Sequence, residues 1–374
     1  MSIYTRELTH DVVYSIGDAH GRGREVVEFL SGLGARARAA GEHAAFVQLG
    51  DLCDCFTLPE PHDNGALRAL IRRRIETVPG LRAAVDGRMF VDWRLFDGSL
   101  REGEVRGFET AETLIECDVP KVLESFYEAT MSFETMHAFV AAQQNDDVIF
   151  VFGNHDADLL RGHSDYGRQQ KYIFLGLLGF GPEEVVAHMQ RGTPEVILRH
   201  PWMKWLNERP HMVMSRDTVY MHGGPTGGLA QQIAALGGFE RWAEMLDDAR
   251  TVGWEHSAFK EHESFLSPDG APNDWVNHPA CILDFLHLAQ RQYLAVGHSP
   301  FLDFEKGPMI DLAHADNLRH LFHTPAQLPP ERRLIKHDTN LKRGGEMWAC
   351  RHEVGTDCWT GVNAQFECTP LRCS

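Results

Sequence analysis

Five short hydrophobic runs along the chain end in the same way. Each run is rich in β-branched and aromatic residues, has the length of a buried strand, and passes into glycine or histidine followed by polar residues. In open α/β sheets, ligands bind just beyond the carboxyl ends of the strands. The shared ending therefore predicts five strands that bring their polar ends to one site. The runs and their endings occupy residues 11–21, 44–54, 147–156, 217–224 and 291–300.

Helical patterns separate these runs. Residues 23–41 carry Val and Leu at helical spacing, and residues 119–145 form a long amphipathic stretch that begins at a proline. Shorter helical patterns lie at 183–192, 200–210 and 227–250. Because strands and helices alternate, the pattern predicts an α/β fold.

The interval between the second and third runs is much longer than a loop. We interpret residues 57–144 as an insertion within a single domain that spans 1–374. The insertion contains a basic helical pattern at 66–78, with arginines at 72–74, and a strand or hairpin pattern at 87–98. An insertion at this place either covers the site and selects the substrate, or is an appendage that only packs on the core. The sequence leaves both interpretations open.

The net charge and the lack of long apolar runs argue against nucleic-acid and membrane partners. The net charge is -17 with His counted neutral, so the surface repels polyanions and a nucleic-acid partner is not expected. The N-terminus has no signal-peptide pattern and the chain has no run of 18 apolar residues, which predicts a cytoplasmic protein without a membrane partner. The eight cysteines are then expected to be thiols. The late ones, Cys350, Cys358, Cys368 and Cys373, lack the C-x2-C spacing of a zinc site.

The polar endings carry residues of the types that bind metal ions. Asp18 and His20 lie two residues apart in GDAHG, and residues at that spacing after a strand can point the same way. Asp51 in GDLCD is a second carboxylate that directly follows a glycine at the end of an apolar run. Its two carboxylate oxygens suit it to bridge two ions. The other three runs supply further candidates that would complete the shell of a second ion, namely Asn154, His222 and His298.

The donor set indicates which ions and which chemistry to expect. Mixed Asp, His and Asn ligation favours Mn, Fe or Zn over Ca, which prefers oxygen alone. Two such ions about 3.5–4 Å apart stabilise the attacking and the leaving oxygens of a phosphoryl displacement. His155, next to Asn154, is left over as a residue that donates a proton to the leaving group or holds the phosphate. Asp54 would orient its ring and keep it protonated.

The ordered motifs GDAHG, GDLCD, GNHD, HGG and GHS resemble those of the calcineurin-like metallophosphoesterases, most closely the phosphoprotein phosphatase branch of bacterial type. The match covers residues 11 to about 300. A further segment, HDTNLKRGG at 337–345, is similar to the ending of bacterial members, including diadenosine tetraphosphate hydrolases. Other branches end in Gly-His-x-His, whereas Pro300 follows GHS here, which favours the phosphatase branch.

The resemblance implies a β-sandwich flanked by helices, with a binuclear centre of two metal ions. The first ion would be held by Asp18, His20 and Asp51. The second would be held by Asp51, Asn154, His222 and His298. The resemblance also implies that His155 acts with Asp54 as the acid pair.

The chain departs from the family pattern after the second motif. Family members usually continue with Asp-Arg-Gly, and that arginine holds the substrate phosphate, but here Cys55 follows Asp54. We expect Arg22, Arg161 or Arg199 to substitute, without a preference among them. The departure and the insertion both argue against ordinary phosphoprotein activity.

Three functional hypotheses follow. The leading one is a metal-dependent phosphatase that cleaves phosphomonoesters of a small molecule or phosphoprotein through a metal-bridging hydroxide. The alternative is a hydrolase of dinucleoside polyphosphates or other pyrophosphates. A third hypothesis, a non-catalytic binding module, predicts missing ligands, yet every expected ligand type is present in the sequence.

Overall fold

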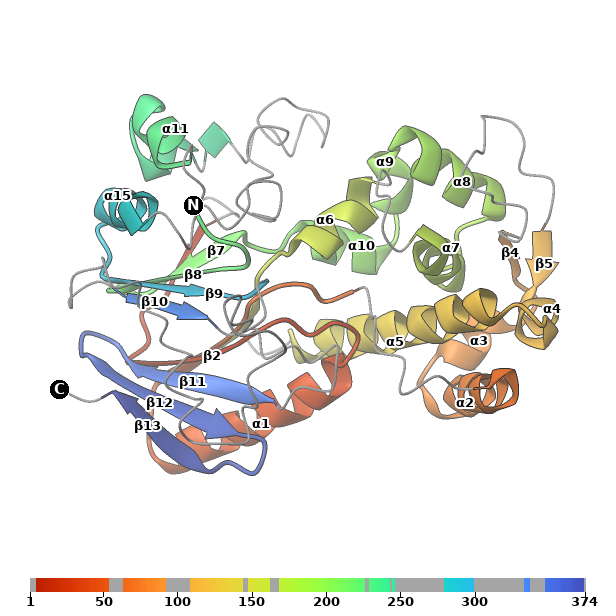
Figure 1. The fold of residues 1–374 in the computed structure, drawn as a ribbon, viewed down its shortest axis with the longest axis horizontal. Coiled ribbons are helices and arrows are strands. Elements are labelled where there is room, and N and C mark those ends of the chain that lie inside the picture. The colour runs from red at the N-terminus through yellow and green to blue at the C-terminus, as the bar shows by residue number, and fades with distance from the viewer. Residues whose placement is uncertain are drawn as a thin grey trace.

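The computed structural model describes residues 5–53, 63–91, 108–143, 147–161, 168–225, 229–242, 244–245, 279–298, 333–336 and 347–372. The protein has an α/β fold, as predicted, with two large sheets and a helical region beside them (Figure 1). One sheet has the order β1 (Thr5–Glu7), β7 (Met212–Met214), β8 (Thr218–Met221), β9 (Tyr293–Val296), β10 (Arg333–Lys336). The other has the order β13 (Cys368–Arg372), β12 (Cys358–Asn363), β11 (Trp348–Glu353), β2 (Val12–Ile16), β3 (Ala44–Gln48), β6 (Val148–Phe150).

The five predicted strands are confirmed as β2, β3, β6, β8 and β9. In one sheet β2, β3 and β6 run parallel, and in the other β8 and β9 run parallel. Every residue of these strands is buried. Strands covered on both faces read as continuous hydrophobic runs, which is why the sequence signal was clear.

The C-terminal strands β11, β12 and β13 were not predicted. They form an antiparallel meander, and β11 pairs with β2 from Ala349 opposite Ile16 to Glu353 opposite Val12. Burial alternates irregularly along β11 and β12, and polar residues interrupt both strands. Their pairing with β2 therefore depends on tertiary contacts that the local sequence does not signal.

Side chains of both large sheets share one buried cluster. Val13, Val47 and Ile149 come from one sheet, and Tyr220 and Ala295 come from the other. Figure 1 shows the two sheets one above the other, with the C-terminal strands β11–β13 below β8, β9 and β10. The shared cluster fixes how the strand ends of the two sheets face each other.

A helical lobe lies beside the sheets (Figure 1). Its centre is α5 (Pro120–Ala142), which contacts α1 (Gly23–Ala39) on the sheet side and both α2 (Asn64–Thr77) and α7 (Arg168–Leu177) within the lobe. The predicted helices at 23–41 and 119–145 are confirmed, and Pro120 occupies the first turn of α5, where its missing N–H costs nothing. The lobe comprises α2 (Asn64–Thr77), α3 (Leu81–Val85), β4 (Met89–Val91), β5 (Phe108–Thr110), α4 (Ala111–Glu116), α5, α7 (Arg168–Leu177) and α8 (Pro182–Arg191).

The remaining helices lie nearer the sheets or link them to the lobe (Figure 1). They are α6 (Asn154–Arg161), α9 (Pro194–Ile197), α10 (Pro201–Asn207), α11 (Leu229–Ala235) and α15 (Pro279–Ala289). The lobe thus draws on residues 168–191 as well as on the segment 57–144 that the sequence singled out. None of the helices in the described ranges is long and apolar enough to cross a membrane. Cys53, Cys117, Cys350, Cys358 and Cys368 are thiols, and Cys373 lies outside the described residues.

The arginine run lies on α2 and is largely engaged within the lobe. Arg72 pairs with Glu112 and Glu116. Arg74 donates to the Thr130 hydroxyl (2.7 Å), to the Thr130 carbonyl (3.1 Å) and to Glu134 (2.7 Å). These contacts favour a structural role for Arg72 and Arg74 within the lobe over a role in binding an anionic substrate.

We expect Arg74→Gln to destabilise the fold by about 1–3 kcal/mol, because it removes a charged donor from three partly buried acceptors. The neighbouring Arg73 offers a matched control, because its side chain is exposed and makes no hydrogen bond or ion pair with the described residues. Arg73→Gln should change the free energy of unfolding by less than about 0.5 kcal/mol. Urea denaturation of the two variants measures the difference, and equal midpoints would contradict the packing role of Arg74.

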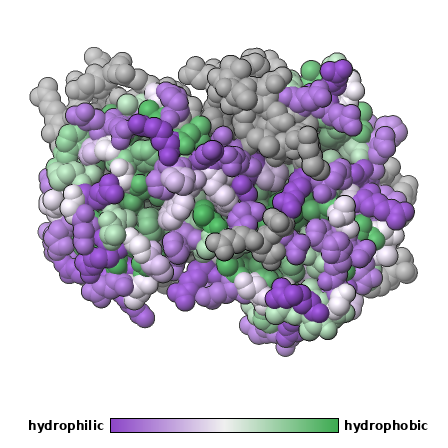
Figure 2. All heavy atoms as spheres, turned by 180° about the vertical axis from the view of Figure 1, so that it is seen from behind, coloured by the Kyte–Doolittle hydropathy of each residue, from purple (hydrophilic) through white to green (hydrophobic). Residues whose placement is uncertain are grey.

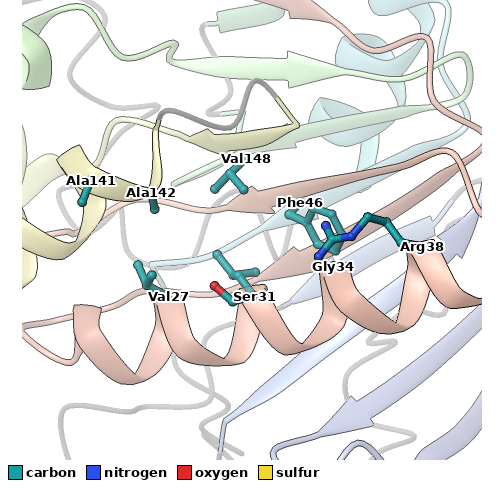
Figure 3. A pocket seen from close by; sticks show the side chains of 9 residues that line it. Val27, Ser31, Gly34, Arg38, Phe46, Ala141, Ala142 and Val148 are labelled. Carbon is teal, nitrogen blue, oxygen red and sulfur yellow. The ribbon is translucent and has the colours of Figure 1, made fainter.

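The surface is mostly hydrophilic on the face shown in Figure 2, with small hydrophobic areas between polar ones. A pocket of about 370 Å³ lies between α1, the end of α5 and strands β3 and β6 (Figure 3). It is lined by Val27, Leu30, Ser31, Gly34, Arg38, Phe46, Ala141, Ala142 and Val148. None of the predicted metal ligands lines this pocket, so the candidate chemistry lies elsewhere.

Candidate metal centre

The carboxyl ends of the five predicted strands converge. Each of the six predicted ligands follows one of these strands within a few residues, and α6 begins directly at Asn154. Hydrogen bonds join the loops, since His20 N donates to the Asp51 carbonyl (2.9 Å) and His298 N donates to the Asp18 carboxylate (3.0 Å). The structure therefore brings together Asp18, His20, Asp51, Asn154, His222 and His298.

The residues predicted for the first ion surround the ring of His20. His20 Nε2 lies 3.5 Å from Asp18 Oδ2 and 3.6 Å from Asp51 Oδ2. All three side chains are almost fully buried. Donor atoms about 2.0–2.2 Å from one ion are about 3–3.5 Å apart, so this spacing is close to that of a shared shell.

The residues predicted for the second ion are closer still. Asn154 Oδ1 lies 2.8 Å from His222 Nε2 and 2.9 Å from His298 Nδ1. His222 Nε2 lies 3.2 Å from His298 Nδ1 and 3.3 Å from Asp51 Oδ1. Four donor atoms from four different strand ends thus face one small volume.

Asp51 belongs to both groups of donor atoms. Among the described residues, two sets of three titratable side chains have ligand atoms within 4.8 Å of one another. One set is His20, Asp51 and His155, and the other is Asp51, His222 and His298. A carboxylate shared by two sets is the arrangement that a bridging ligand requires.

Backbone strain concentrates at the same place. Five described residues other than glycine have a positive φ, and three of these are predicted ligands: His20 (41°), Asp51 (49°) and His298 (63°). A non-glycine residue in this region costs about 1–3 kcal/mol and persists where the surroundings over-determine it, often at functional sites. The strain is thus an independent signal that these loops are shaped for side-chain placement.

Two glycines make room for the carboxylates. A Cβ atom on Gly153 would collide with the backbone and carboxylate of Asp51. A Cβ atom on Gly297 would collide with the carboxylate of Asp18 and crowd the Leu49 carbonyl. Glycine at these two positions therefore allows the loops after β6 and β9 to approach the acidic residues.

The charges of the centre are strongly coupled. Burial alone would raise the pKa of Asp18, but His222 and His20 outweigh burial and hold that pKa well below its usual range. Burial is likewise outweighed at Asp51, whose pKa is lowered by His222 and His155. Burial would lower the pKa of His222, but the Asp51 and Asp18 carboxylates raise it to about 10. The pair of buried carboxylates demands a positive partner, and a divalent cation would meet that demand.

The orientation of His222 fits a ligand role. Its Nδ1 lies 2.7 Å from the Leu49 carbonyl, which can only accept, so Nδ1 carries the proton of the neutral ring. A pKa of about 10 keeps Nε2 protonated as well without an ion, but in the neutral ring that an ion would require, the Nε2 lone pair faces Asn154 and Asp51. Fixing the tautomer by a backbone carbonyl is the usual support of a metal-binding histidine. The donor set and its spacing fit transition-metal ions.

His155 lies at the edge of the centre. Its backbone N–H, at the start of α6, donates to Asp51 Oδ1 (3.0 Å), and its ring Nε2 lies 3.8 Å from Asp51 Oδ2. The side chain is 14% exposed, more than those of Asp51 and His20. This position suits a residue that meets a substrate, although its membership of the first set also makes it a candidate ligand. Asp54, its predicted partner, lies outside the described residues.

The two candidate phosphate-binding arginines with described side chains, Arg22 and Arg199, are not brought together. Arg22 immediately precedes α1 and donates to Glu25 (3.3 Å). Arg199 is 64% exposed and donates to Glu184 (2.7 Å), away from the ligand loops in sequence and in its described contacts. Arg161 ends α6, but its side chain lies outside the described residues.

Sequence reasoning missed a second layer of residues. Asp156 is fully buried, and its carboxylate accepts from Gly153 N (2.9 Å), Leu52 N (3.1 Å) and Cys53 N (3.3 Å), which ties the loop after β6 to the loop after β3. Burial, and then the charge of Asp51, raise the pKa of Asp156 to about 7. Gln48 is buried in the same layer. The sequence shows an Asp directly after Asn-His and a Gln within an apolar run, and both are signals of a buried polar residue. It does not show which backbone groups these two side chains bind.

No family model and no curated protein sequence matches the chain. Among solved structures, the chain is similar to a cold-active protein tyrosine phosphatase at 12% identity and a TM-score of 0.46, over 99% of this chain and 81% of that one. It is also similar to a protein assigned provisionally as a diadenosine tetraphosphatase, at 12% identity and a TM-score of 0.38, over 97% of this chain and 98% of that one. Likenesses of this degree assign no activity to the chain, so its function has to be inferred from the geometry of the centre.

Proposed function

We propose that the protein is a metal-dependent phosphohydrolase that cleaves phosphomonoesters at a centre for two transition-metal ions, Mn, Fe or Zn. The observation that carries the proposal is the sharing of Asp51 between two sets of ligand atoms. A single structural ion would need one set only. Two sets joined by a carboxylate suit in-line displacement at phosphorus, where both the attacking and the leaving oxygen need charge stabilisation.

In this proposal the chain's own residues position the reaction. Asp18, His20 and Asp51 hold the first ion, and Asp51, Asn154, His222 and His298 hold the second. When bound, the ions supply a nucleophilic water of lowered pKa and neutralise charge on the phosphoryl group. Asp18, His20, Asp51 and His222 are buried, which limits the access of bulk water to their ligand atoms.

His155 is assigned the proton donor to the leaving oxygen. It is the most exposed of the histidines that contact Asp51 through their side chains, so it can reach a substrate that the buried residues cannot. Asp54 is assigned the role of orienting its ring. For the phosphate, Arg22 is the better placed of the two arginines with described side chains, because it follows the His20 loop by two residues.

The fold is assigned to the metallophosphoesterase-type β-sandwich, as one domain over 1–374 with the segment 57–144 as a cap. Support comes from the cluster that both large sheets share and from the position of the lobe beside the strand ends. Gly23 N, at the start of α1, donates to Thr135 Oγ1 of α5 (3.1 Å), so the cap segment contacts the element that follows the His20 loop. The substrate is assigned to phosphorylated compounds in general.

The test is metal depletion and reconstitution. We expect the purified protein, stripped of metal by a chelator, to regain phosphate release when about two equivalents of Mn²⁺, Fe²⁺ or Zn²⁺ are added. The panel should include p-nitrophenyl phosphate, phosphopeptides, nucleotides, sugar phosphates and dinucleoside polyphosphates. Cleavage confined to the last group would replace the phosphomonoesterase assignment with the pyrophosphate alternative. Two bound ions without any hydrolysis would favour a binding module instead.

A further inference from the structure

Gln48 is a polar side chain where the sequence pattern calls for an apolar one. It is the last residue of β3, it follows Val47, and it is fully buried. A long amide in such a place costs free energy unless its hydrogen bonds are satisfied. Its contacts therefore indicate what it is for.

The Gln48 amide joins two loops. Nε2 donates to the carbonyl of Gly17 (3.0 Å) and to the carbonyl of Gly50 (2.6 Å), and Oε1 accepts from Gly50 N (3.2 Å). The two carbonyls need a donor and the N–H needs an acceptor, so only one orientation of the amide satisfies all three groups. Gly17 precedes Asp18 and Gly50 precedes Asp51, so a single side chain spans the two acidic loops.

We propose that Gln48 is a positioning residue that sets the separation of Asp18 and Asp51, and thereby the affinity of the first ion. The inference rests on the proposed function in that it assumes ions at this centre. The backbone ladder between β2 and β3 ends where Ile16 lies opposite Gln48. Beyond that point two backbone bonds still join the segments, from Leu49 N to the Ile16 carbonyl (3.0 Å) and from His20 N to the Asp51 carbonyl (2.9 Å), and the Gln48 amide adds the link between Gly17 and Gly50.

The chemistry of the site explains why an amide occupies it. Methionine has a similar length but would leave three buried backbone groups without a partner. A glutamate has no N–H to donate to the two carbonyls, and its charge would lie beside two buried carboxylates. Only the amide offers two donors and an acceptor without a charge.

The consequence is asymmetric between the two ions. Asp51 and the other residues of the second ion have supports of their own. His155 N donates to Asp51 Oδ1, Asp156 accepts from Gly153 N and Leu52 N, and the Leu49 carbonyl orients His222. The Asp18 loop is held by His298 N, by the bond from His20 N to the Asp51 carbonyl, and by Gln48, which supplies the side-chain donor to the Gly17 carbonyl next to Asp18. Loss of the amide should therefore weaken the first ion and spare the second.

The experiment compares metal titrations of Gln48→Met and the wild type, using Co²⁺ absorbance as the readout. Two ligand variants assign the binding steps: His20→Ala removes a ligand of the first ion, and Asn154→Ala removes a ligand of the second. We expect Gln48→Met to weaken the His20-dependent step about 10- to 100-fold, the usual effect of removing an outer-shell partner. The Asn154-dependent step should keep its wild-type affinity.

Two controls separate positioning from loss of stability. Ile149→Ala opens a cavity in the core between the sheets, so it destabilises the fold while leaving the loops intact, and its metal titration should match the wild type. Amide hydrogen exchange at Gly50, measured without metal, should accelerate in Gln48→Met but not in Ile149→Ala. Should Gln48→Met fold poorly, Gln48→Asn serves instead, because it keeps the amide but falls one methylene short of its partners.

The outcomes separate the two proposals. Wild-type affinity for both ions in Gln48→Met, or a loss confined to the Asn154-dependent step, would overturn the role of Gln48. A wild-type protein that binds both ions but hydrolyses no phosphate compound would overturn the proposed function, while the titration would still decide the role of Gln48. A wild-type protein that binds no ion would overturn both.

Discussion

Asp51→Asn is expected to abolish binding of both metal ions and most phosphatase activity. Asp51 Oδ1 lies 3.3 Å from His222 Nε2 and Asp51 Oδ2 lies 3.6 Å from His20 Nε2, so one carboxylate serves both groups of donors. An amide keeps the size of the side chain but has one weak acceptor oxygen in place of two charged ones. Activity should fall by at least about 10²- to 10³-fold, because charge stabilisation in the transition state is lost. Metal analysis and phosphate release measure the two effects.

A matched variant guards against general destabilisation. Asp217 is also buried, and its carboxylate accepts from the hydroxyls of Ser215 and Thr218 and from Gly355 N, far from the ligand loops along β8. Asp217→Asn should therefore lower the free energy of unfolding yet leave the metal content unchanged. If Asp51→Asn retains two ions and full turnover, Asp51 does not bridge them.

His155→Asn is expected to lower kcat by about 10²- to 10⁴-fold while leaving the metal content nearly intact, because the side chain is assigned general acid catalysis. The effect should shrink for aryl phosphates, whose leaving groups need little protonation. The KM for either substrate should change less than kcat. Rates for an aryl and an alkyl phosphate, measured with the same metal-loaded protein, test the expectation.

The competing role of His155 is that of a ligand, because its ring belongs to the set with His20 and Asp51. The neighbouring variant Asn154→Ala provides the contrast, since it should lose one ion. Loss of an ion in His155→Asn as well would make His155 a ligand. An equal loss of rate for aryl and alkyl phosphates would remove it from the acid role.

The sequence by itself determined the buried strands and the long helices. Strands covered on both faces need a continuous hydrophobic run, and β2, β3, β6, β8 and β9 carry that run in their own residues. The candidate ligands were visible for a related reason. Asp or His side chains directly after a buried strand have few structural roles within their own segment. Five strands with such endings therefore indicate one shared binding site.

Only the tertiary structure decided how the C-terminal strands pair and which buried polar residues support the ligand loops. The C-terminal meander forms because β2 offers a partner edge, and nothing within residues 348–372 reveals that edge. Gln48 and Asp156 act through backbone groups up to 104 residues away, and hydrogen bonds of such reach leave no periodic trace in the sequence. The sequence leaves open whether the arginines on α2 meet a substrate or pair with carboxylates, and the structure pairs Arg74 with Glu134 and Arg72 with Glu116. Local patterns record burial, whereas pairing between distant polar groups is set by how the sheets and the lobe pack.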